Sequence, residues 1–283
     1  MAQILTGAEV VETLNEQIVA EIELLKGRGV QPTLAIIRVG ERGDDIAYER
    51  GAGRLAERLG VAVRSIVLPE ETTTSLLAQT VESLNGDRNI HGVLMFRPLP
   101  AHIDEGLVRN ALVPQKDIDG ITDLSLAGVF TDHPTGFAPC TAQACMEILA
   151  HFAIELKGKK AVVIGRSLVV GKPVAMMLLA EHATVTIAHS RTLDLQDIVR
   201  EADLVIACVG QAHLIDGSFL SPGQVVIDVG INVAEEGYLV GDVVFEEAAA
   251  VVGAVSPVPG GVGTVTTSVL MKHVVSAAFK QTS

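Results

Sequence analysis

The sequence predicts an α/β fold with a parallel, twisted sheet in each half of the chain. Short apolar runs rich in valine and isoleucine alternate with segments of helical periodicity, which is typical of successive βα units. The runs are continuously apolar, as expected for parallel strands that helices cover on both faces. A chain of 283 residues is long enough for about two domains.

The first half contains three predicted strands and two predicted helices. The strands are expected at 34–40, 63–69 and 92–98. A helical pattern runs from Glu49 to Leu59 and ends at Gly60, which we interpret as a C-cap. A second helical pattern runs from Ser75 to Leu84 and ends before an Asn-Gly pair.

The second half repeats the same alternation, with strands expected at 160–165, 183–190, 203–210 and 224–230. Residues 114–141 are rich in turn-forming residues and lack a sustained period, so we interpret them as the segment that joins the two halves. Thr266 to Ala278 is predicted to be a helix that packs back on either half.

These elements predict two domains. The first covers residues 1–140, and the second covers residues 141–265 and is expected to be Rossmann-like. The C-terminal helix, at about 266–283, is expected to pack back on the first domain.

The composition excludes several classes of protein. Apolar residues make up 48% of the chain, which rules out intrinsic disorder. The longest apolar stretch, around 248–255, is far shorter than the ~20 residues that span a bilayer. The N-terminus has no basic segment leading into an apolar core, so no secretory signal is expected.

Charge and cysteine content narrow the choice of partners and location. The 21 basic residues against 34 acidic ones give a net charge of −13, which argues against nucleic acid or an anionic membrane as the partner. The three cysteines, Cys140, Cys145 and Cys208, are too few and too scattered for a disulfide framework or a zinc cluster. We therefore expect a cytoplasmic protein that holds no metal.

A glycine-containing turn after the strand at 160–165 predicts a phosphate-binding site. Gly165 permits a sharp turn, and Gly171 and Pro173 open a helix whose N–H groups can point at a phosphate. Arg166 and Ser167 lie within the turn. The spacing, G-x-x-x-x-x-G-x-P, is a variant of the dinucleotide-binding fingerprint. The alternative is a tight strand-to-helix turn that binds no ligand.

The end of the next predicted strand favours NADP over NAD. NAD-binding units usually place a carboxylate there to accept a hydrogen bond from the ribose 2′-hydroxyl. Here the strand is followed by Ser190, Arg191 and Thr192, which supply hydroxyl groups and a cation suited to a 2′-phosphate. The alternative is that Arg191 is a solvated surface residue.

Several long segments together carry a resemblance to a known family. They are GRSLVVGKP, ATVTIAHSRT, ADLVIACVG, VVIDVGIN and PVPGGVGTVT in this order, preceded by Tyr48, RPLP and PQKDIDG. The chain resembles the bifunctional 5,10-methylenetetrahydrofolate dehydrogenase/5,10-methenyltetrahydrofolate cyclohydrolase (FolD) family over nearly its whole length. The resemblance implies two α/β domains flanking a cleft that holds tetrahydrofolate derivatives. It also implies NADP on the C-terminal domain and a homodimer formed through the nucleotide domains.

The resemblance also implies site residues. Tyr48 and Asp119 are the implied catalytic residues. The implied substrate-binding residues are Tyr48, Phe96, Arg97, Asp119, Pro259, Gly260 and Gly261. The implied cofactor-binding residues are Gly165, Arg166, Ser167, Gly171, Pro173, Ser190, Arg191, Thr192, Gly210 and Ile231. The alternative for Tyr48 is a half-buried helix residue without a catalytic role.

The sequence departs from the family pattern at positions that bear on proton transfer. The family's Ser-x-x-Tyr-Val-x-x-Lys segment has Asp45 at the serine position and Ala52 at the lysine position. Its Val-Gln-Leu-Pro-Leu-Pro segment has Phe96 at the glutamine position and Arg97 at the leucine position. The usual Pro-Met after the glycine loop is replaced by Thr264 and Val265.

These departures leave three hypotheses open. Hydride transfer needs alignment of donor and acceptor, whereas hydrolysis of the methenyl group needs proton transfer that Ala52 and Phe96 do not provide. The first hypothesis is therefore an NADP-dependent dehydrogenase with weak or absent cyclohydrolase activity. The second is a bifunctional enzyme in which another group, with Asp45 as the candidate, transfers the proton. The third is a diverged paralogue that binds NADP but has a different substrate or none.

Overall fold

The computed structural model describes residues 1–133, 135–234 and 237–282. The chain divides into two compact units, each built from two stretches of sequence. The N-terminal unit comprises Thr13–Cys140 and Thr267–Ser283. The C-terminal unit comprises Met1–Glu12 and Thr141–Thr266. Both units are α/β with a parallel sheet, which confirms the predicted fold class.

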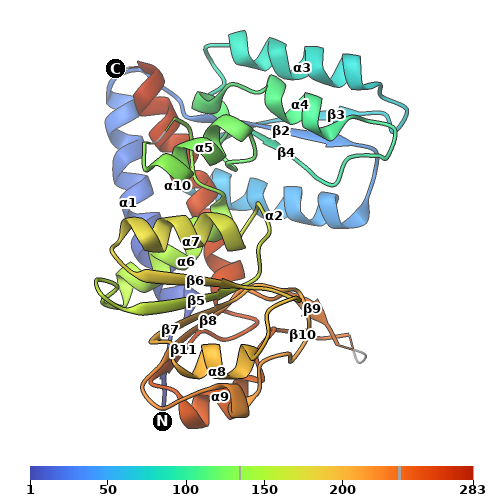
Figure 1. Cartoon of the computed structure of the whole chain (residues 1–283). Helices are drawn as coiled ribbons and strands as arrows, with labels where there is room; N and C mark the ends of the chain where they lie inside the picture. Colours follow the sequence, from blue (N-terminus) through green and yellow to red (C-terminus); the bar gives the residue numbers. More distant parts are fainter. Residues whose placement is uncertain (134, 235–236, 283) are drawn as a thin grey trace. The chain divides into compact units, whose positions relative to one another are not determined.

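The sheet of the N-terminal unit has three strands in the order β3 (Ala62–Leu68), β2 (Thr33–Val39) and β4 (Gly92–Met95). Both neighbouring pairs are parallel, and all three predicted strands are confirmed. α2 (Gly43–Leu59) lies on one face of this sheet, while α3 (Thr74–Gly86) and α4 (Glu105–Ala111) lie on the other (Figure 1).

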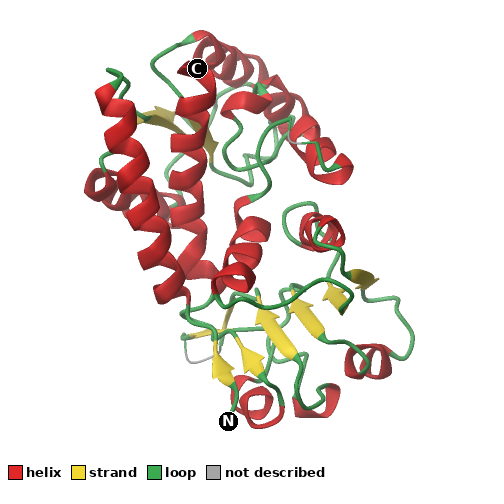
Figure 2. Ribbon diagram, turned by 90° about the vertical axis from the view of Figure 1, so that its left-hand side faces the viewer, coloured by secondary structure: helices red, strands yellow, loops and turns green. Residues whose placement is uncertain are grey.

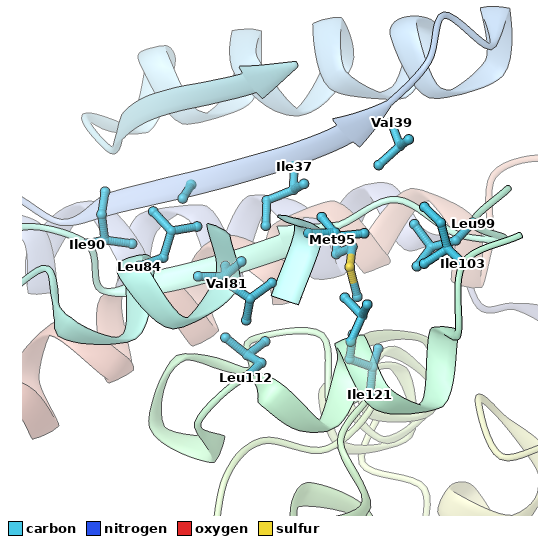
Figure 3. Close-up of a cluster of buried hydrophobic side chains, with 14 residues drawn as sticks. Ile37, Val39, Val81, Leu84, Ile90, Met95, Leu99, Ile103, Leu112 and Ile121 are labelled. Atoms are coloured by element: carbon cyan, nitrogen blue, oxygen red, sulfur yellow. The ribbon is translucent and has the colours of Figure 1, made fainter. Parts of the chain in front are cut away.

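An apolar core joins the sheet to α3 and α4. Figure 3 shows Ile37 and Met95 of the sheet pointing toward Val81 of α3, with Leu112 after α4 and Ile121 closing the cluster. All five side chains are at most 5% exposed. Because this packing fixes β2 and β4 rigidly, the loops that follow these two strands begin from a well-defined edge.

α2 begins at Gly43, six residues before the expected start at Glu49. Its end is as predicted: Gly60 is left-handed (φ 92°), and its N–H donates to the Ala56 and Glu57 carbonyl groups. The first turn carries Asp44 and Asp45, as is favourable at a helix N-terminus. This early start places Asp45 and Tyr48 within the helix.

The interpretation of 114–141 as a joining segment is wrong, because these residues, up to Cys140, belong to the N-terminal unit and contain regular structure. They form the 3₁₀-helix η1 (Pro114–Lys116) and α5 (Asp123–Thr131). The fully buried Asp117 carboxylate accepts the N–H groups of Ile121 and Thr122 at 2.9 and 2.8 Å. Side-chain hydrogen bonds to the backbone, which leave no hydrophobic period, therefore hold this segment.

The predicted C-terminal helix is confirmed as α10 (Val262–Thr282), which begins four residues before the expected start at Thr266. It lies beside α1 (Gly7–Gly27), a helix that the sequence did not predict (Figures 1 and 2). In the N-terminal unit Ser268 Oγ donates to Asn15 Oδ1 at 3.0 Å. α10 is long and apolar enough to span a membrane, but 61% of its apolar window is buried in the protein, as in a core helix.

The C-terminal unit contains a six-stranded parallel sheet. Its strand order is β1 (Gln3–Ile4), β11 (Ala254–Val255), β8 (Val225–Asp228), β7 (Leu204–Ala207), β5 (Lys160–Ile164) and β6 (Thr184–Ala188). Four of these strands, β5 to β8, were predicted and are confirmed. α6 (Cys140–His151) and α7 (Gly171–Ala180) cover one face, and α8 (Leu195–Arg200) and α9 (Phe245–Val251) cover the other (Figure 1).

The first residues of the chain lie in a different unit from the one that the sequence suggested. Gln3 and Ile4 of β1 pair with Ala254 and Val255 of β11, so residues 1–12 extend the C-terminal sheet. The two-residue strand is too short to leave a periodic signal. The 3₁₀-helix η2 (Gly217–Phe219) and an antiparallel pair, β9 (Asn232–Val233) and β10 (Leu239–Val240), complete the C-terminal unit.

Candidate functional site

The N-terminal unit has a pocket where its strand order reverses direction. β2 and β4 are neighbours, and the chain leaves their carboxyl ends toward different helices, which is the usual place for a ligand in an open α/β sheet. The pocket has a volume of about 330 Å³. It is lined by Arg42, Asp44, Asp45, Tyr48, Leu94, Met95, Phe96, Arg97 and Asp119. The four predicted substrate residues of this unit therefore line one pocket.

Tyr48 and Phe96 form one side of this pocket. Their ring centroids are 5.7 Å apart and the planes meet at 84°, an edge-to-face contact. Tyr48 as a whole is 43% exposed, while its hydroxyl is hydrogen-bonded to Thr267. Desolvation raises the pKa of Tyr48 to about 12, with a smaller opposing effect of the Thr267 bond. The hydroxyl therefore stays protonated at neutral pH.

Asp119 stands opposite in the same pocket, with its side chain 28% exposed. Burial raises the pKa of Asp119 to about 6, whereas the nearby Arg97 guanidinium lowers it and Asp117 raises it. Arg97 Nη2 lies 3.9 Å from Asp119 Oδ2, and Arg97 Nη1 lies 3.5 Å from Glu105 Oε1. Cys140 also hydrogen-bonds Asp119. At neutral pH most of the Asp119 carboxyl is ionised.

Ala52 and Asp45 lie on α2, one turn after and one turn before Tyr48. Ala52 is 1% exposed, so its methyl group is enclosed by neighbouring atoms. The Asp45 carboxylate lies 3.9 Å from Arg42 Nε at the helix start. Of these three residues, Tyr48 and Asp45 line the pocket.

In the C-terminal unit the strand order reverses between β5 and β7, and the predicted phosphate-binding turn follows β5. Gly165 has φ 134°, and a Cβ atom there would lie 2.5 Å from the Cys208 carbonyl oxygen. A Cβ on Gly171 would lie 2.4 Å from the Gly165 oxygen. Ser167 Oγ accepts the N–H of Val170 at 3.1 Å. Only glycine at these two positions permits so tight an approach to the start of α7.

The residues after β6 form a compact turn. The His189 N–H donates to the Thr192 hydroxyl at 2.8 Å, and the Arg191 N–H donates to His189 Nδ1 at 3.1 Å. The Ser190 and Arg191 side chains are exposed, as is that of Arg166 after β5. Within the described residues, 1–133, 135–234 and 237–282, the guanidinium groups of Arg166 and Arg191 form no ion pair. Both cations are available to an anionic ligand.

Two buried carboxylates, which the sequence did not single out, hold the loops after β7 and β8. Asp242 accepts the N–H groups of Val209, Gly210 and Gln211 at 2.6 to 3.0 Å. Asp228 accepts the N–H groups of Gly230, Asp242 and Val243 at 2.9 to 3.0 Å. Burial raises the pKa of Asp228 to about 6.

These two aspartates determine where Gly210 and Ile231, both predicted cofactor residues, lie. The sequence offers a partial signal for Asp228, a carboxylate that ends an apolar strand, and none for Asp242, which follows an isolated glycine. Asn232 Nδ2 also donates to Asp242, at 3.0 Å. The two loops therefore share one hydrogen-bonded support.

A second pocket in the C-terminal unit, of about 260 Å³, brings the predicted glycine loop close to Ile231. The residues of this loop that line it are Pro257, Val258, Pro259, Gly260, Gly261, Gly263 and Thr264. Val265 is fully buried and does not line the pocket. In the described part of the chain, no group of three or more His, Cys, Asp or Glu side chains is arranged to hold a metal ion.

Both halves of the chain match family models. Residues 5–119 match the catalytic domain of tetrahydrofolate dehydrogenase/cyclohydrolase, and residues 139–282 match its NAD(P)-binding domain. The chain is 46% identical over 279 residues to the bifunctional protein FolD of Clostridioides difficile, covering 99% of this chain and 97% of that protein.

Solved structures are also similar. The bifunctional FolD enzyme of Campylobacter jejuni superimposes with a TM-score of 0.96 at 35% identity, covering 99% of each chain. The Trypanosoma brucei FolD, complexed with NADP cofactor and inhibitor, has a TM-score of 0.93 at 36% identity, covering 99% of this chain and 98% of that one. The sequence matches cover both units from end to end. The chain therefore belongs to the tetrahydrofolate dehydrogenase/cyclohydrolase family, whose bifunctional members are named FolD.

Proposed function

We propose that this protein oxidises 5,10-methylenetetrahydrofolate to 5,10-methenyltetrahydrofolate with NADP and hydrolyses the methenyl product weakly or not at all. One observation carries the proposal. The pocket of the N-terminal unit keeps Tyr48 and Asp119, but among the residues that the structure describes its lining contains no lysine, histidine or side-chain amide. Phe96 lies against Tyr48 instead. The groups suited to binding are present, and those suited to proton transfer are largely absent.

The oxidation fits this pocket because it requires no proton transfer to the protein. The C–H bond of the methylene bridge breaks with its electron pair, and a lone pair of a neighbouring ring nitrogen forms a C=N bond, so the folate becomes a cation. The pocket lining holds three carboxylates, on Asp44, Asp45 and Asp119, against the two guanidinium groups of Arg42 and Arg97. This excess of negative charge favours the cationic product and the transition state that leads to it.

The hydrolysis needs proton-transfer groups, and Tyr48, Arg97, Ala52 and Phe96 do not supply them. Water must lose a proton as it attacks the methenyl carbon, and a proton must then reach the departing ring nitrogen. The Tyr48 hydroxyl, with a pKa of about 12, is a poor base at neutral pH. The guanidinium of Arg97 does not give up a proton. Ala52 does not titrate and Phe96 does not hydrogen-bond, so we infer slow hydrolysis.

The residues of the C-terminal unit fit NADP. The close approach of Gly165 and Gly171 leaves room at the start of α7, where N–H groups of the first turn suit a pyrophosphate. Ser167 lies in the loop before α7, and Pro173 lies in the first turn of this helix. The guanidinium groups of Arg166 and Arg191 suit a 2′-phosphate, together with the Ser190 and Thr192 hydroxyl groups. When bound, NADP supplies the electron acceptor of the oxidation.

The folate side of the proposal assigns Asp119 and Tyr48 the catalytic roles. The Asp119 carboxylate accepts N–H groups of the pterin ring, and Tyr48 orients the ring nitrogens through its hydroxyl. Phe96 and Arg97 complete the substrate-binding surface of the N-terminal unit, which we propose as the folate domain. Pro259, Gly260 and Gly261, in the C-terminal unit that we propose as the NADP domain, are further proposed substrate-binding residues.

A second candidate, a fully bifunctional enzyme, is favoured by the position of Asp45. Its carboxylate lines the pocket one helical turn before Tyr48, and a carboxylate there can accept a proton from water. The Asp45 carboxylate also lies 3.9 Å from Arg42 Nε, at the start of the helix. In this candidate Asp45→Asn lowers the rate of methenyl hydrolysis much more than the rate of oxidation, because the hydrolysis loses its base whereas the oxidation loses only part of the negative charge of the pocket.

We also propose that the protein is a cytoplasmic homodimer formed through its C-terminal units. The exposed apolar side chains of Val233, Tyr238 and Leu239 on the β9–β10 ribbon support this, because a partner subunit commonly covers such a surface. Sedimentation equilibrium tests it, with Val233→Glu as the disrupting variant. A wild-type protein that sediments as a monomer contradicts it.

The experiment is NADPH formation by the purified protein with 5,10-methylenetetrahydrofolate, monitored by absorbance. We expect NADP-dependent turnover that Asp119→Asn reduces by at least about tenfold, since loss of a charged hydrogen bond costs about 1.5–3 kcal/mol. Asp132→Asn, an exposed change in the same unit, serves as the matched control. Folded protein that binds NADP but forms no NADPH contradicts the proposal and favours a diverged paralogue.

A further inference from the structure

Arg97 occupies a position in the pocket that the oxidation chemistry alone does not explain. It lies just after β4, beside Phe96, and its side chain is 22% exposed. Its two terminal nitrogens reach different carboxylates, Glu105 at 3.5 Å and Asp119 at 3.9 Å. The Glu105 contact comes from the first turn of α4, a rigid element that packs in the core. The contact with Glu105 therefore holds the Arg97 guanidinium next to Asp119.

Asp119 has few other positive neighbours. The charged and titratable groups that face it from the surrounding elements are Arg97, Asp117, Cys140 and Tyr48. The pocket also presents Arg42, Asp44 and Asp45, and His273 of α10 reaches Cys140 Sγ at 3.7 Å. Asp117 repels the charge of Asp119. Burial raises the pKa of the Cys140 thiol well above its usual value, so this thiol stays neutral. The Arg42 guanidinium contacts Asp45.

We propose that Arg97 is the counter-ion that keeps the Asp119 carboxylate charged and directed into the pocket, so that Arg97 sets the affinity for the pterin ring. This inference rests on the proposed function and deepens it, because it names the positioning residue behind the substrate-binding carboxylate. A charged carboxylate accepts two N–H groups of a pyrimidine edge, whereas a protonated one offers a donor that opposes them. Arg97 acts through Asp119 and need not touch the substrate.

The guanidinium suits this task better than an ammonium group would. It presents several N–H groups in one plane, so it contacts Glu105 and Asp119 at once. The burial that raises the pKa of Asp119 to about 6 acts against the charged form, and Arg97 offsets part of it. Without Arg97, Asp119 takes up its proton at higher pH.

The test measures binding of tetrahydrofolate by calorimetry from pH 5 to pH 9, with wild type and Arg97→Leu. We expect the wild-type affinity to fall below about pH 6. In Arg97→Leu we expect the pH at which the affinity falls to be about one unit higher, because an opposite charge at this distance shifts a pKa by about that much. The affinity is then about fivefold lower at pH 6, about twofold lower at pH 7 and unchanged at pH 9.

Three further variants make the result specific. Arg97→Lys keeps the charge and is expected to keep the fall within about half a pH unit of wild type. Arg97→Gln is a second neutral variant that retains a polar side chain should Arg97→Leu fold poorly. Arg42→Leu is the matched control, because it removes a guanidinium from the same pocket that contacts Asp45 instead. The proposal is overturned if the affinity falls at the same pH in both neutral variants as in the wild type. It is also overturned if Arg42→Leu shifts this pH as much as the neutral variants do.

A measurement without ligand separates this proposal from the proposed function. The carboxyl carbon of Asp119, assigned by comparison with Asp119→Asn, is titrated by NMR in the wild type and in the Arg97 variants. An upward shift of its midpoint in the neutral variants supports the ion pair even if the protein proves not to oxidise folate. An unchanged midpoint contradicts the ion pair even if the protein is an active dehydrogenase.

Discussion

Phe96 meets Tyr48 edge to face, with ring centroids 5.7 Å apart and planes at 84°. Ala52 follows Tyr48 by one helical turn and is 1% exposed. The side of α2 that carries Tyr48 therefore continues as a closed, apolar surface. A proton-transferring pair at positions 52 and 96 would need both a titratable group and the space that the Phe96 ring now fills.

Restoring such a pair is expected to create hydrolytic activity. Ala52→Lys with Phe96→Gln supplies an amine and an amide, and we expect methenyl hydrolysis to rise by roughly 10²-fold or more. Ala52→Lys alone is expected to lower the free energy of unfolding by several kcal/mol, because it buries an ammonium group without a partner. Decay of the methenyl absorbance and chemical denaturation measure the two effects. If Phe96→Gln alone raised the rate of methenyl hydrolysis as much as the double variant, the prediction would be wrong.

Arg191 is expected to decide between NADP and NAD. Arg191→Ala removes an exposed guanidinium that has no ion pair in the described part of the chain, so the cost to stability is small. We expect the KM for NADP to rise by at least about tenfold, the loss of a charge-assisted bond to a phosphate, while the KM for NAD is unchanged. Arg200→Ala, an exposed arginine at the end of α8, is the matched control. Equal changes for both cofactors would argue against a 2′-phosphate contact.

Asp242 is expected to control cofactor affinity without touching the folate pocket. In Asp242→Asn an amide N–H₂ faces at least one of the N–H groups of Val209, Gly210 and Gln211, which leaves a buried donor unpaired. We expect the free energy of unfolding to fall by about 1–3 kcal/mol and the KM for NADP to rise by about tenfold. The KM for folate should change little. Asp194→Asn, exposed and left-handed, is the control because asparagine tolerates that conformation.

Asp119 is expected to make the protein less stable as pH rises. Its pKa in the folded state, about 6, lies above its ordinary value of 3.8, so the folded protein binds the proton more tightly than the unfolded chain. Its contribution to stability is therefore complete below about pH 4 and lost above about pH 6. Asp119→Asn should gain stability relative to wild type across this interval. Denaturation at several pH values measures the difference in the free energy of unfolding between Asp119→Asn and the wild type. A difference that stays constant or falls as pH rises would refute the assignment.

The sequence predicts most of the architecture because parallel strands buried on both faces leave continuous apolar runs. The strands β2 to β8, the left-handed Gly60 and the glycine turn after β5 all follow from such local patterns. The elements that the sequence does not predict leave no local pattern in it. The start of α2 is polar and glycine-rich, β1 has two residues, and α5 depends on hydrogen bonds from Asp117 and Thr122.

The site divides in the same way. Four of the residues that line the pocket, Tyr48, Phe96, Arg97 and Asp119, lie in motifs that the sequence displays. The residues that hold the site residues and their loops in place do not lie in such motifs. Asp242 reaches across about 30 positions to the loop after β7, and Glu105 becomes a partner of Arg97 only when α4 packs on the sheet. Long-range contacts of this kind depend on tertiary packing, which no spacing rule encodes.

The most direct test of the central claim compares two products during one dehydrogenase reaction. NADPH and 5,10-methenyltetrahydrofolate are measured together as the purified protein oxidises 5,10-methylenetetrahydrofolate. We predict that methenyltetrahydrofolate accumulates in equal amount with NADPH and then decays only at the rate of the buffer. NADPH that forms while methenyltetrahydrofolate stays low, because it is hydrolysed as fast as it appears, would contradict the account.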